Sequence, residues 1–382
     1  MAAAPTSVVC RELRLRQFRN FAELDLVFPP EGAAVIGDNG SGKTNLLEAI
    51  YYLEIFRSFR GAADEQLVRF GAEAFYVRGR FEDLATGEVR EVTAAFERRT
   101  RRKRVTVNGA EPERLGDALG RVGAVVFSPS DVAIVAGAPG ERRRFLDIVL
   151  SLNEPGYLTA LQRYRQLLRQ RNAVLRRGGS AALLGAWDEG LVEWGARVMA
   201  ARAAWVAARA EGFARRYASI AGGPTARLRY RSSVPLGGTE VPTVAEAAEA
   251  FRAELARIAP RERERQMTLA GPHRDELAFL LETETGEIDV REYGSGGQQR
   301  TAAIVLRMIE AETVREARGW EPLILLDDIF AELDPGRSRR ILELIEAEEP
   351  GQVILTAPKA SDLEMRGGSL VHWRIAGGRV FA

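Results

Sequence analysis

The segment 37–44 constrains the fold more than any other part of the sequence, because it reads Gly-Asp-Asn-Gly-Ser-Gly-Lys-Thr. A short apolar run, Ala33–Ile36, precedes it, and residues 45–56 that follow carry apolar side chains at the three- and four-residue spacing of a helix. The spacing G-x-x-x-x-G-K-[ST] between a strand and a helix is that of a phosphate-binding loop. The chain is therefore expected to have an α/β fold that contains a P-loop nucleotide site.

The residue types in this loop suit the binding of phosphate groups. Its glycines let successive backbone N–H groups converge on phosphate oxygens, and the following helix adds the positive end of its dipole. Lys43 is expected to reach the β- and γ-phosphates of ATP, and the Thr44 hydroxyl is expected to bind Mg²⁺. The predicted nucleotide-binding residues of the loop are Gly37, Asp38, Asn39, Gly40, Ser41, Gly42, Lys43 and Thr44.

A second part of the predicted site lies near the other end of the chain, where residues 323–328 read Leu-Ile-Leu-Leu-Asp-Asp. Continuous apolar residues are typical of a buried parallel strand, and ligand groups gather at the carboxyl ends of such strands. Asp327 is therefore expected to hold Mg²⁺ with Thr44, directly or through water, and Asp328 to orient or deprotonate the attacking water. Lys43, Asp327 and Asp328 form the predicted catalytic set.

The composition is that of an ordinary globular protein, and it excludes few functions. The 382 residues are enough for two or three domains, or for one domain with a large insertion. The single cysteine, Cys10, excludes an internal disulfide and fits a reducing cytoplasm, and one cysteine with two histidines disfavours a zinc site. No apolar run approaches the roughly 18 residues of a membrane span, and Met1–Ser7 lacks the basic residues of a signal peptide. A cytoplasmic protein without a membrane partner is expected.

Nucleotide-type elements are predicted at both ends of the chain, with helices inserted between them. The region 142–217 has a helical pattern with arginines opposite its apolar faces, and Gly178-Gly179 with Ser180 divides it into a short helical hairpin. A further helix is expected over Ala245–Ile258. The main predicted strands are Val8–Gln17, Phe21–Phe28, Ala33–Ile36, Ala74–Phe81, Val89–Glu97, Lys103–Val107, Ala124–Phe127, Leu277–Leu281, Leu323–Leu326 and Val353–Leu355. The predicted domains are an N-terminal part of a nucleotide-binding head over 1–150, an inserted helical domain over 151–258 and a C-terminal part of the head over 259–382.

Gly294–Arg300 reads Gly-Ser-Gly-Gly-Gln-Gln-Arg and opens a predicted helix about 30 residues before the acidic strand. Together with Ala-Glu-Leu-Asp at 331–334, this order resembles the ABC-type ATPase family. The resemblance implies an ABC-type P-loop ATPase head with a strand-rich N-terminal lobe and an inserted helical domain. It also implies an ATP-dependent homodimer, in which each copy contacts the γ-phosphate bound by the other through Ser295, Gly296, Gly297 and Gln298.

Further stretches resemble the RecF family, in the family's own order. They are Leu13–Phe21, Asn39–Ile50, Arg57–Arg60, Phe127–Asp131, Arg142–Asp147, Gln170–Asn172, Gly271–Asp275 and Gly297–Arg300. The resemblance implies an ATP-dependent DNA-binding protein of recombinational repair and replication restart, which assists RecA loading at single-strand/double-strand junctions with RecO and RecR. It also implies a weak, DNA-stimulated ATPase. Two positions depart from the pattern: RecF-like loops often have glutamine at Gly296, and most ABC-type enzymes have glutamate at Asp328, whose shorter side chain suits slow hydrolysis.

The densest basic run lies at a predicted hairpin tip, over 98–104. Its predicted DNA contacts are Arg101, Arg102, Lys103 and Arg104, because cations that bind phosphates give sequence-independent, salt-sensitive affinity. A solvated surface loop is the alternative. The chain has 54 lysines and arginines, of which only Lys43, Lys103 and Lys359 are lysine, so a GC-rich genome also explains abundant arginine.

Two other functions stay open on the sequence alone. One is a structural SMC-like ATPase, although the helical hairpin is short for a coiled-coil arm. The other is a transporter-associated ABC ATPase, although the strand Val353–Leu355 leads to Thr356, where transporter-type heads carry a histidine.

Overall fold

The computed structural model describes residues 7–223, 225–284, 286–329, 334–348, 350–359 and 370–381. The chain forms two compact units. The first unit combines residues 1–131 and 310–382 from the two ends of the chain, and the second consists of residues 132–309 between them.

A six-stranded sheet carries the phosphate loop and the acidic strand in the first unit. Its strand order is β14-β13-β3-β12-β11-β7, and every neighbouring pair is parallel except β13 with β14. The carboxyl ends of β3, β12 and β11 therefore meet at one edge of the sheet. The strands are β3 (Gly32–Ile36), β7 (Ala124–Phe127), β11 (Leu323–Asp327), β12 (Val353–Ala357), β13 (Val371–Ala376) and β14 (Arg379–Phe381).

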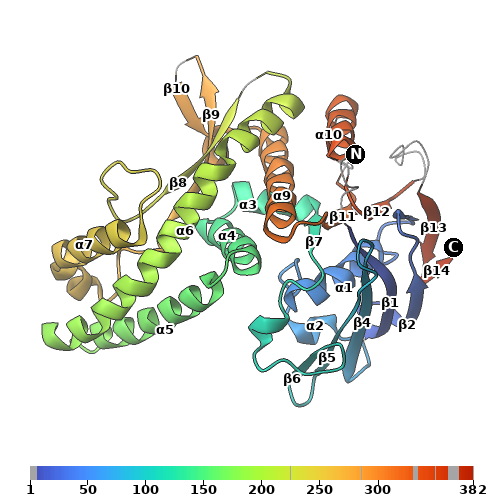
Figure 1. The fold of residues 1–382 in the computed structure, drawn as a ribbon, viewed down its shortest axis with the longest axis horizontal. Helices are drawn as coiled ribbons and strands as arrows, with labels where there is room; N and C mark the ends of the chain where they lie inside the picture. The colour runs from blue at the N-terminus through green and yellow to red at the C-terminus, as the bar shows by residue number, and fades with distance from the viewer. Residues whose placement is uncertain are drawn as a thin grey trace. The chain divides into compact units, whose positions relative to one another are not determined.

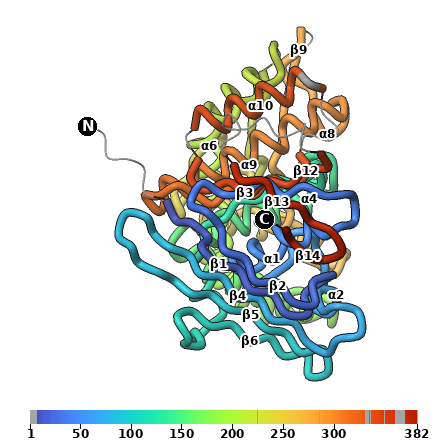
Figure 2. The backbone as a smooth tube through the Cα atoms, turned by 90° about the vertical axis from the view of Figure 1, so that its right-hand side faces the viewer, coloured from blue at the N-terminus to red at the C-terminus, as the bar shows by residue number. Residues whose placement is uncertain are grey.

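An antiparallel sheet in the order β2-β1-β4-β5-β6 completes the strand-rich part of this unit, and Figure 2 shows its strands side by side. Helix α1 contacts strands of both sheets, and 11 of its 13 residues are buried. The bounds are β1 (Val8–Phe18), β2 (Phe21–Val27), α1 (Lys43–Ile55), α2 (Asp64–Leu67), β4 (Ala74–Asp83), β5 (Val89–Glu97), β6 (Arg102–Val107) and α10 (Pro335–Ala347).

Helices make up most of the second unit. Helices α5 and α6 lie side by side, and α6 also contacts α7 and β8, which belongs to the antiparallel sheet β10-β9-β8 (Figure 1). The helices are α3 (Val132–Ala136), α4 (Pro139–Asn153), α5 (Tyr157–Arg176), α6 (Ala181–Ala221), α7 (Val244–Arg265), α8 (Val290–Tyr293) and α9 (Gly296–Arg318), which ends in the first unit. The strands are β8 (Ala226–Arg231), β9 (Glu276–Thr283) and β10 (Gly286–Asp289).

This unit covers more of the sequence than the predicted helical domain 151–258, because α4 and the three-stranded sheet pack with the long helices. The predicted hairpin also omitted a break. Gly156, with a left-handed φ of +80°, separates α4 from α5 before the predicted division at Gly178 and Gly179. The predicted strands, in contrast, are confirmed to within two residues at each end.

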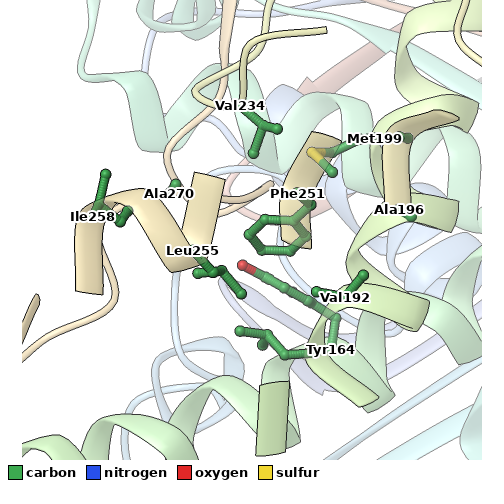
Figure 3. Packing of buried hydrophobic residues seen from close by; sticks show 11 residues of the cluster. Tyr164, Val192, Ala196, Met199, Val234, Phe251, Leu255, Ile258 and Ala270 are labelled. Carbon is green, nitrogen blue, oxygen red and sulfur yellow. The ribbon is translucent and has the colours of Figure 1, made fainter. Parts of the chain in front are cut away.

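The core of the second unit gathers apolar side chains from α5, α6 and α7. Figure 3 shows Phe251 in the middle of this cluster, with Met199, Leu255 and Tyr164 around it. A Cβ atom at Gly195 would lie 2.7 Å from the Phe251 ring and 3.1 Å from the Tyr164 ring. Only glycine therefore lets α6 approach both rings.

Three helical arginines correct the expectation that these side chains lie on exposed faces. Arg142, Arg171 and Arg202 are each 2% exposed. Arg171 of α5 donates hydrogen bonds to Asp188 of α6 (2.6 Å) and Glu262 of α7 (2.7 Å), so it links three helices. Charged side chains are tolerated at such depth only when they are paired and hydrogen-bonded.

Helix α7 also extends beyond its predicted end at Ile258, although Pro260 lies within it. The reason is tertiary contact in the following turn. Glu262 binds Arg171, and its other carboxylate oxygen accepts a hydrogen bond of 2.8 Å from the Leu269 N–H group. None of the helices in the described ranges combines the length and the apolar character needed to cross a bilayer.

Candidate nucleotide-binding site

The phosphate loop connects β3 to the first turn of α1, as predicted. Gly40 and Gly42 have left-handed φ values of +80° and +114°. A Cβ atom at Gly42 would lie 2.4 Å from the side-chain nitrogen of Asn20, whereas one at Gly40 would meet nothing within 4 Å. The loop is thus closed by Asn20 on one side and open at Gly40, where a phosphate group has room.

Asn20, in the turn between β1 and β2, supports the loop from outside. Its side-chain N–H group donates to the Ser41 carbonyl (2.9 Å), and its side-chain oxygen accepts from Asn45 (2.8 Å). Sequence reasoning assigned Asn20 no such role. Its position in a tight two-residue turn, next to Arg19, was the only available signal.

Lys43 lies at the base of the loop and is 4% exposed. Its ammonium group donates to the Gly37 carbonyl (2.7 Å) and lies 3.6 Å from the Asp328 carboxylate. The Asp38 carbonyl is also within 3.4 Å. The predicted lysine and the second predicted acid are thus brought together.

The Thr44 hydroxyl donates a hydrogen bond of 2.8 Å to Asp327 at the carboxyl end of β11. Asp327 is 4% exposed. Burial raises the pKa of Asp327 to about 6, and the hydrogen bond from Thr44 opposes this rise. The two predicted metal ligands therefore face each other in a poorly solvated place, where a bound cation stabilises the carboxylate.

Asp328 follows β11 with a left-handed φ of +45°, a conformation that is costly for most residues and better tolerated by aspartate. Its N–H group donates to the Thr356 hydroxyl (3.1 Å), which in turn donates to Asp327 (3.1 Å). Thr356 thus links the two acids. On the sequence it marked only a departure from transporter-type heads.

A cleft of about 1080 Å³ extends from the phosphate loop. Lys43, Thr44 and Asp328 line one part of it, and Phe70, which is 97% exposed, lines another. Arg19, Arg60, Arg69 and Arg98 supply further positive charge along its walls. The cleft therefore combines cations, loop amides and an exposed aromatic ring.

The β1–β2 turn sets the spacing between the phosphate loop and the part of the cleft that Phe70 lines. Asn20 bonds to the phosphate loop, while the N–H group of the adjacent Arg19 donates to the Leu67 carbonyl (2.7 Å). The Arg69 N–H group donates to Gln17 on β1 (2.8 Å), which places Phe70 directly after this anchored segment. Phe70 was not singled out on the sequence.

The residues present fit ATP with Mg²⁺. Ser41 Oγ is buried and has no hydrogen-bond partner within the described residues, so the loop holds a polar atom that a phosphate oxygen would satisfy. Lys43 and the loop amides would hold the phosphates, and Thr44 and Asp327 would hold the metal. Mg²⁺ typically takes one or two protein ligands together with phosphate oxygens.

The predicted signature loop lies in the second unit, where Ser295 and Gly296 are exposed. The Gln298 N–H group lies 3.3 Å from Ser295 Oγ, and the Gln298 side-chain oxygen accepts from the Ser295 N–H group (2.7 Å). This reciprocal pair is a capping box that opens helix α9. Gly297 follows in the first turn of α9, and residues 331–333 of the further motif lie outside the described residues.

The basic run occupies the β5–β6 turn and the start of β6. Lys103 is not a free surface cation, because it pairs with Asp64 (2.8 Å) and donates to the Phe56 carbonyl (2.6 Å). Arg101 pairs with Glu65 and Arg104 with Glu111, although both arginine side chains are largely exposed. A role of this run in DNA binding stays a prediction.

The family described as RecF/RecN/SMC N terminal domain matches residues 9–367 of the chain. Among curated relatives, the DNA replication and repair protein RecF of Salinibacter ruber is 39% identical over 94% of this chain and 86% of its own length. The RecF protein of Anaeromyxobacter dehalogenans is 39% identical over 93% of this chain and 94% of its own length.

Solved structures give the same result. A structure described as the recombination mediator protein RecF with ATP, in the RecFOR pathway, has a TM-score of 0.89 and 30% identity, and the match covers 100% of this chain and 99% of that one. The Smc head domain of Pyrococcus furiosus, at 15% identity and a TM-score of 0.57, shares the fold over 98% of this chain and 95% of its own. The ABC-type head fold expected from the sequence is confirmed, and the chain belongs to the RecF family of DNA replication and repair proteins.

Proposed function

We propose that this chain is a cytoplasmic, ATP-dependent DNA-binding protein of recombinational repair and replication restart. In this proposal ATP joins two copies on DNA, slow hydrolysis releases them, and the protein assists RecA loading at single-strand/double-strand junctions with RecO and RecR. The names of the relatives, which include a recombination mediator of the RecFOR pathway, support this role.

The observation that carries the ATPase part is the convergence of Lys43, Thr44, Asp327 and Asp328 at one edge of the parallel sheet. These residues come from two distant parts of the chain, so their meeting is a property of the fold. An open glycine loop, a buried lysine and a hydroxyl–carboxylate pair are the parts that phosphoryl transfer needs.

Each side chain then has one task. Lys43 and the loop N–H groups hold the β- and γ-phosphates, and Thr44 and Asp327 orient the metal. Bound Mg²⁺ neutralises the charge that develops on the phosphate oxygens. Asp328 lies beside Lys43 and orients the attacking water or accepts its proton. Thr356 holds Asp328 in its strained conformation through the backbone N–H group.

Phe70 supplies the base-binding part of the proposed cleft. Its exposed ring offers a face for stacking, which is favourable for any purine. Phosphate contacts alone would not distinguish a nucleotide from inorganic phosphates, so the ring adds preference for a base.

Dimer formation is proposed on the exposed Ser295 end of α9. The first N–H groups of a helix attract anions, and the capping box keeps them in place. An SMC-like arm needs two long helices that pair along their length. Here α5 has 20 residues and spans about 30 Å, and the longer α6, with 41 residues, also packs against α7 and β8, so this alternative gains no support.

Sedimentation with ATP, with ADP and without nucleotide, each with and without duplex DNA, tests the proposal. Wild type should form dimers only with ATP, and DNA should cosediment with them. Lys43→Ala should bind no ATP and stay monomeric. Ser295→Arg should keep ATP affinity and lose the dimer, because bulk and charge block the contact with the partner's γ-phosphate.

Ser180→Arg is the matched control, because Ser180 is also an exposed N-cap serine, at the start of α6. It should dimerise like wild type. Equal dimers in wild type with ADP and with ATP, or normal dimers of Ser295→Arg, would remove the composite site from the proposal.

A further inference from the structure

A second cavity, of about 160 Å³, lies within the second unit among α4, α5, α6 and the segment before β9. It shares no lining residue with the nucleotide cleft. Its charged lining consists of four arginines and one carboxylate, namely Arg143, Arg144, Arg165, Arg202 and Asp147. We call this cavity the arginine pocket.

The one carboxylate is already fully engaged. Asp147 Oδ1 accepts from Arg202 (2.7 Å) and from the Tyr157 hydroxyl (2.7 Å), and its Oδ2 accepts from Arg165 (2.7 Å). Arg202 also donates to the Pro272 carbonyl (2.7 Å), so it serves as a structural ion-pair partner. Four guanidinium groups against one carboxylate leave three positive charges among the lining residues.

The other arginines keep donors for a ligand. Arg143 donates one hydrogen bond, to the Asp275 carbonyl (2.9 Å). Arg144 makes no hydrogen bond or ion pair within the described part of the chain, and it is exposed. Arg165 donates one hydrogen bond, to Asp147, and its side chain is 55% exposed. Burial lowers the pKa of Arg143; the charge of Glu276 opposes this effect, and the nearby Arg202 adds to it.

Helix α4 adds a further source of positive potential. Gly140, in the first turn of this 15-residue helix, lines the pocket. The N-cap residue, Ala138, has no side chain that could cap the helix, and a Cβ atom at Gly140 would meet nothing within 4 Å. Pro139, the first residue of the helix, has no N–H group, and the Glu141 N–H group donates to the Ala138 carbonyl (2.9 Å). The Gly140 N–H group and the positive end of the helix dipole are therefore what this helix end offers to an anion.

The remaining wall of the pocket is neutral. His273 Nε2 lies 3.1 Å from the Thr268 carbonyl, which only accepts, so Nε2 carries the proton. His273 Nδ1 then accepts from the Tyr164 hydroxyl (2.6 Å). Burial lowers the pKa of His273 to about 4, and the ring stays uncharged. Tyr164 keeps a lone pair that accepts but adds no negative charge.

From this arrangement we infer that the arginine pocket binds a phosphate group. Arginine forks match the oxygens of phosphate in geometry and charge. The volume lies below the roughly 300 Å³ of pockets that enclose whole small molecules, which suits one phosphate group with the rest of its carrier outside. The phosphate group belongs either to a nucleic-acid backbone or to free inorganic phosphate. The nucleic-acid case rests on the DNA binding of the proposed function, and the free-phosphate case does not.

The test compares Arg144→Gln/Arg165→Gln with the matched control Arg197→Gln/Arg215→Gln. The control removes two exposed arginines of α6 that pair with carboxylates on the same helix. Duplex DNA affinity is measured at several salt concentrations. Binding of inorganic phosphate is measured by phosphorus NMR, with Lys43→Ala present in every protein to silence the phosphate loop.

If the carrier is nucleic acid, the pocket variant should lose about tenfold or more in DNA affinity, and the log–log salt slope should fall by about one to two units, while the control stays near wild type. If the carrier is free phosphate, DNA binding should be unchanged and phosphate binding should disappear only in the pocket variant. Equal behaviour of pocket and control variants in both assays would overturn the inference.

Two further variants keep the test decisive. Arg144→Gln alone breaks no contact among the described residues, so it serves if loss of the Arg165–Asp147 pair unfolds the protein. Arg144→Lys/Arg165→Lys should restore part of the binding, because it keeps the charge and loses the fork. If wild type binds no DNA, the proposed function fails on that point, and the phosphate assay still decides the pocket.

Discussion

Thr44 and Asp327 are 283 positions apart in the chain, yet the hydroxyl of the first donates a hydrogen bond of 2.8 Å to the carboxylate of the second. Parallel pairing brings them together, because β12 pairs with β3 on one side and with β11 on the other. A hydroxyl and a carboxylate at this separation are two adjacent ligands suited to Mg²⁺.

Asp327→Asn should uncouple nucleotide binding from magnesium. The amide keeps the shape and the hydrogen bond but lacks the charge that attracts the cation. Wild type should bind ATP about tenfold or more tightly with Mg²⁺ than with a chelator, and the variant should show little difference. A calorimetric titration in both buffers measures this ratio. A variant that keeps the wild-type ratio would exclude Asp327 as a metal ligand.

Asp328→Asn should leave ATP affinity nearly unchanged and slow single-turnover hydrolysis by about 10²- to 10⁴-fold. Asparagine tolerates the left-handed backbone at this position at least as well as aspartate, so the fold should not suffer. ATP-bound dimers should therefore persist in sedimentation. If affinity collapses while bound ATP turns over normally, the roles given to Asp327 and Asp328 are reversed.

Phe70→Ala should weaken ATP binding by about 2- to 12-fold, the range expected for the loss of one stacking contact. Binding of inorganic triphosphate should not change, since this ligand has no base. Phe381→Ala, which removes another exposed phenylalanine of the same unit, is the control. Equal losses for ATP and triphosphate would show that Phe70 acts on the loop and not on the base.

His273 should make stability depend on pH. Burial lowers the pKa of His273 to about 4 from the ordinary value of 6.5, and the charges of Arg274, Arg143 and Arg171 add to this. The unfolded chain therefore binds a proton at a higher pH than the folded protein does. The contribution of the uncharged His273 to the free energy of unfolding is fully present above pH 6.5 and is lost as the pH falls towards 4. Its upper limit is roughly 3 kcal/mol.

Carboxylates also change stability at acidic pH, so the pH dependence of stability is compared between wild type and His273→Gln. The difference between the two proteins is the contribution of His273. Between about pH 7 and pH 4.5, the thermal midpoint of wild type should fall further than that of the variant. The same pH dependence in both proteins would mean that His273 is accessible to protons in the folded state.

Arg171→Met should destabilise the second unit by about 3–5 kcal/mol, because it leaves Glu262 buried without its partner. The double variant Arg171→Met/Glu262→Met should recover most of this loss, since two apolar side chains can replace a buried pair. Chemical denaturation of the three proteins gives the comparison. A single variant as stable as wild type would show that water reaches Glu262.

The parts of this molecule that short patterns encode were predictable. The strand before the phosphate loop, the helix after it and the acidic strand each follow from local spacing, and the bounds of Val89–Glu97 and Ala124–Phe127 are those predicted. Carboxyl ends of parallel strands meet at one edge, so the meeting of Thr44 with Asp327 was also expected.

The partners of buried charges were not predictable, because they depend on residues far away in the chain. Arg202 is tolerated in the interior because it pairs with Asp147, 55 positions before it in the chain. Arg171 likewise pairs with Glu262, 91 positions after it. In a chain so rich in arginine, nothing local separates these residues from exposed ones such as Arg197. Lys103 belongs to the same class, since Asp64 and a backbone carbonyl hold it.

The position of β3 has a consequence for the order of synthesis. A nascent chain delivers the phosphate loop early, but both hydrogen-bonded neighbours of β3, which are β12 and β13, follow it by more than 300 positions. Residues 132–309 are all available before either neighbour exists. We expect a truncated or stalled product that ends before Val353 to contain the complete loop sequence and yet bind no nucleotide, so that only copies that include β12 and β13 respond to ATP.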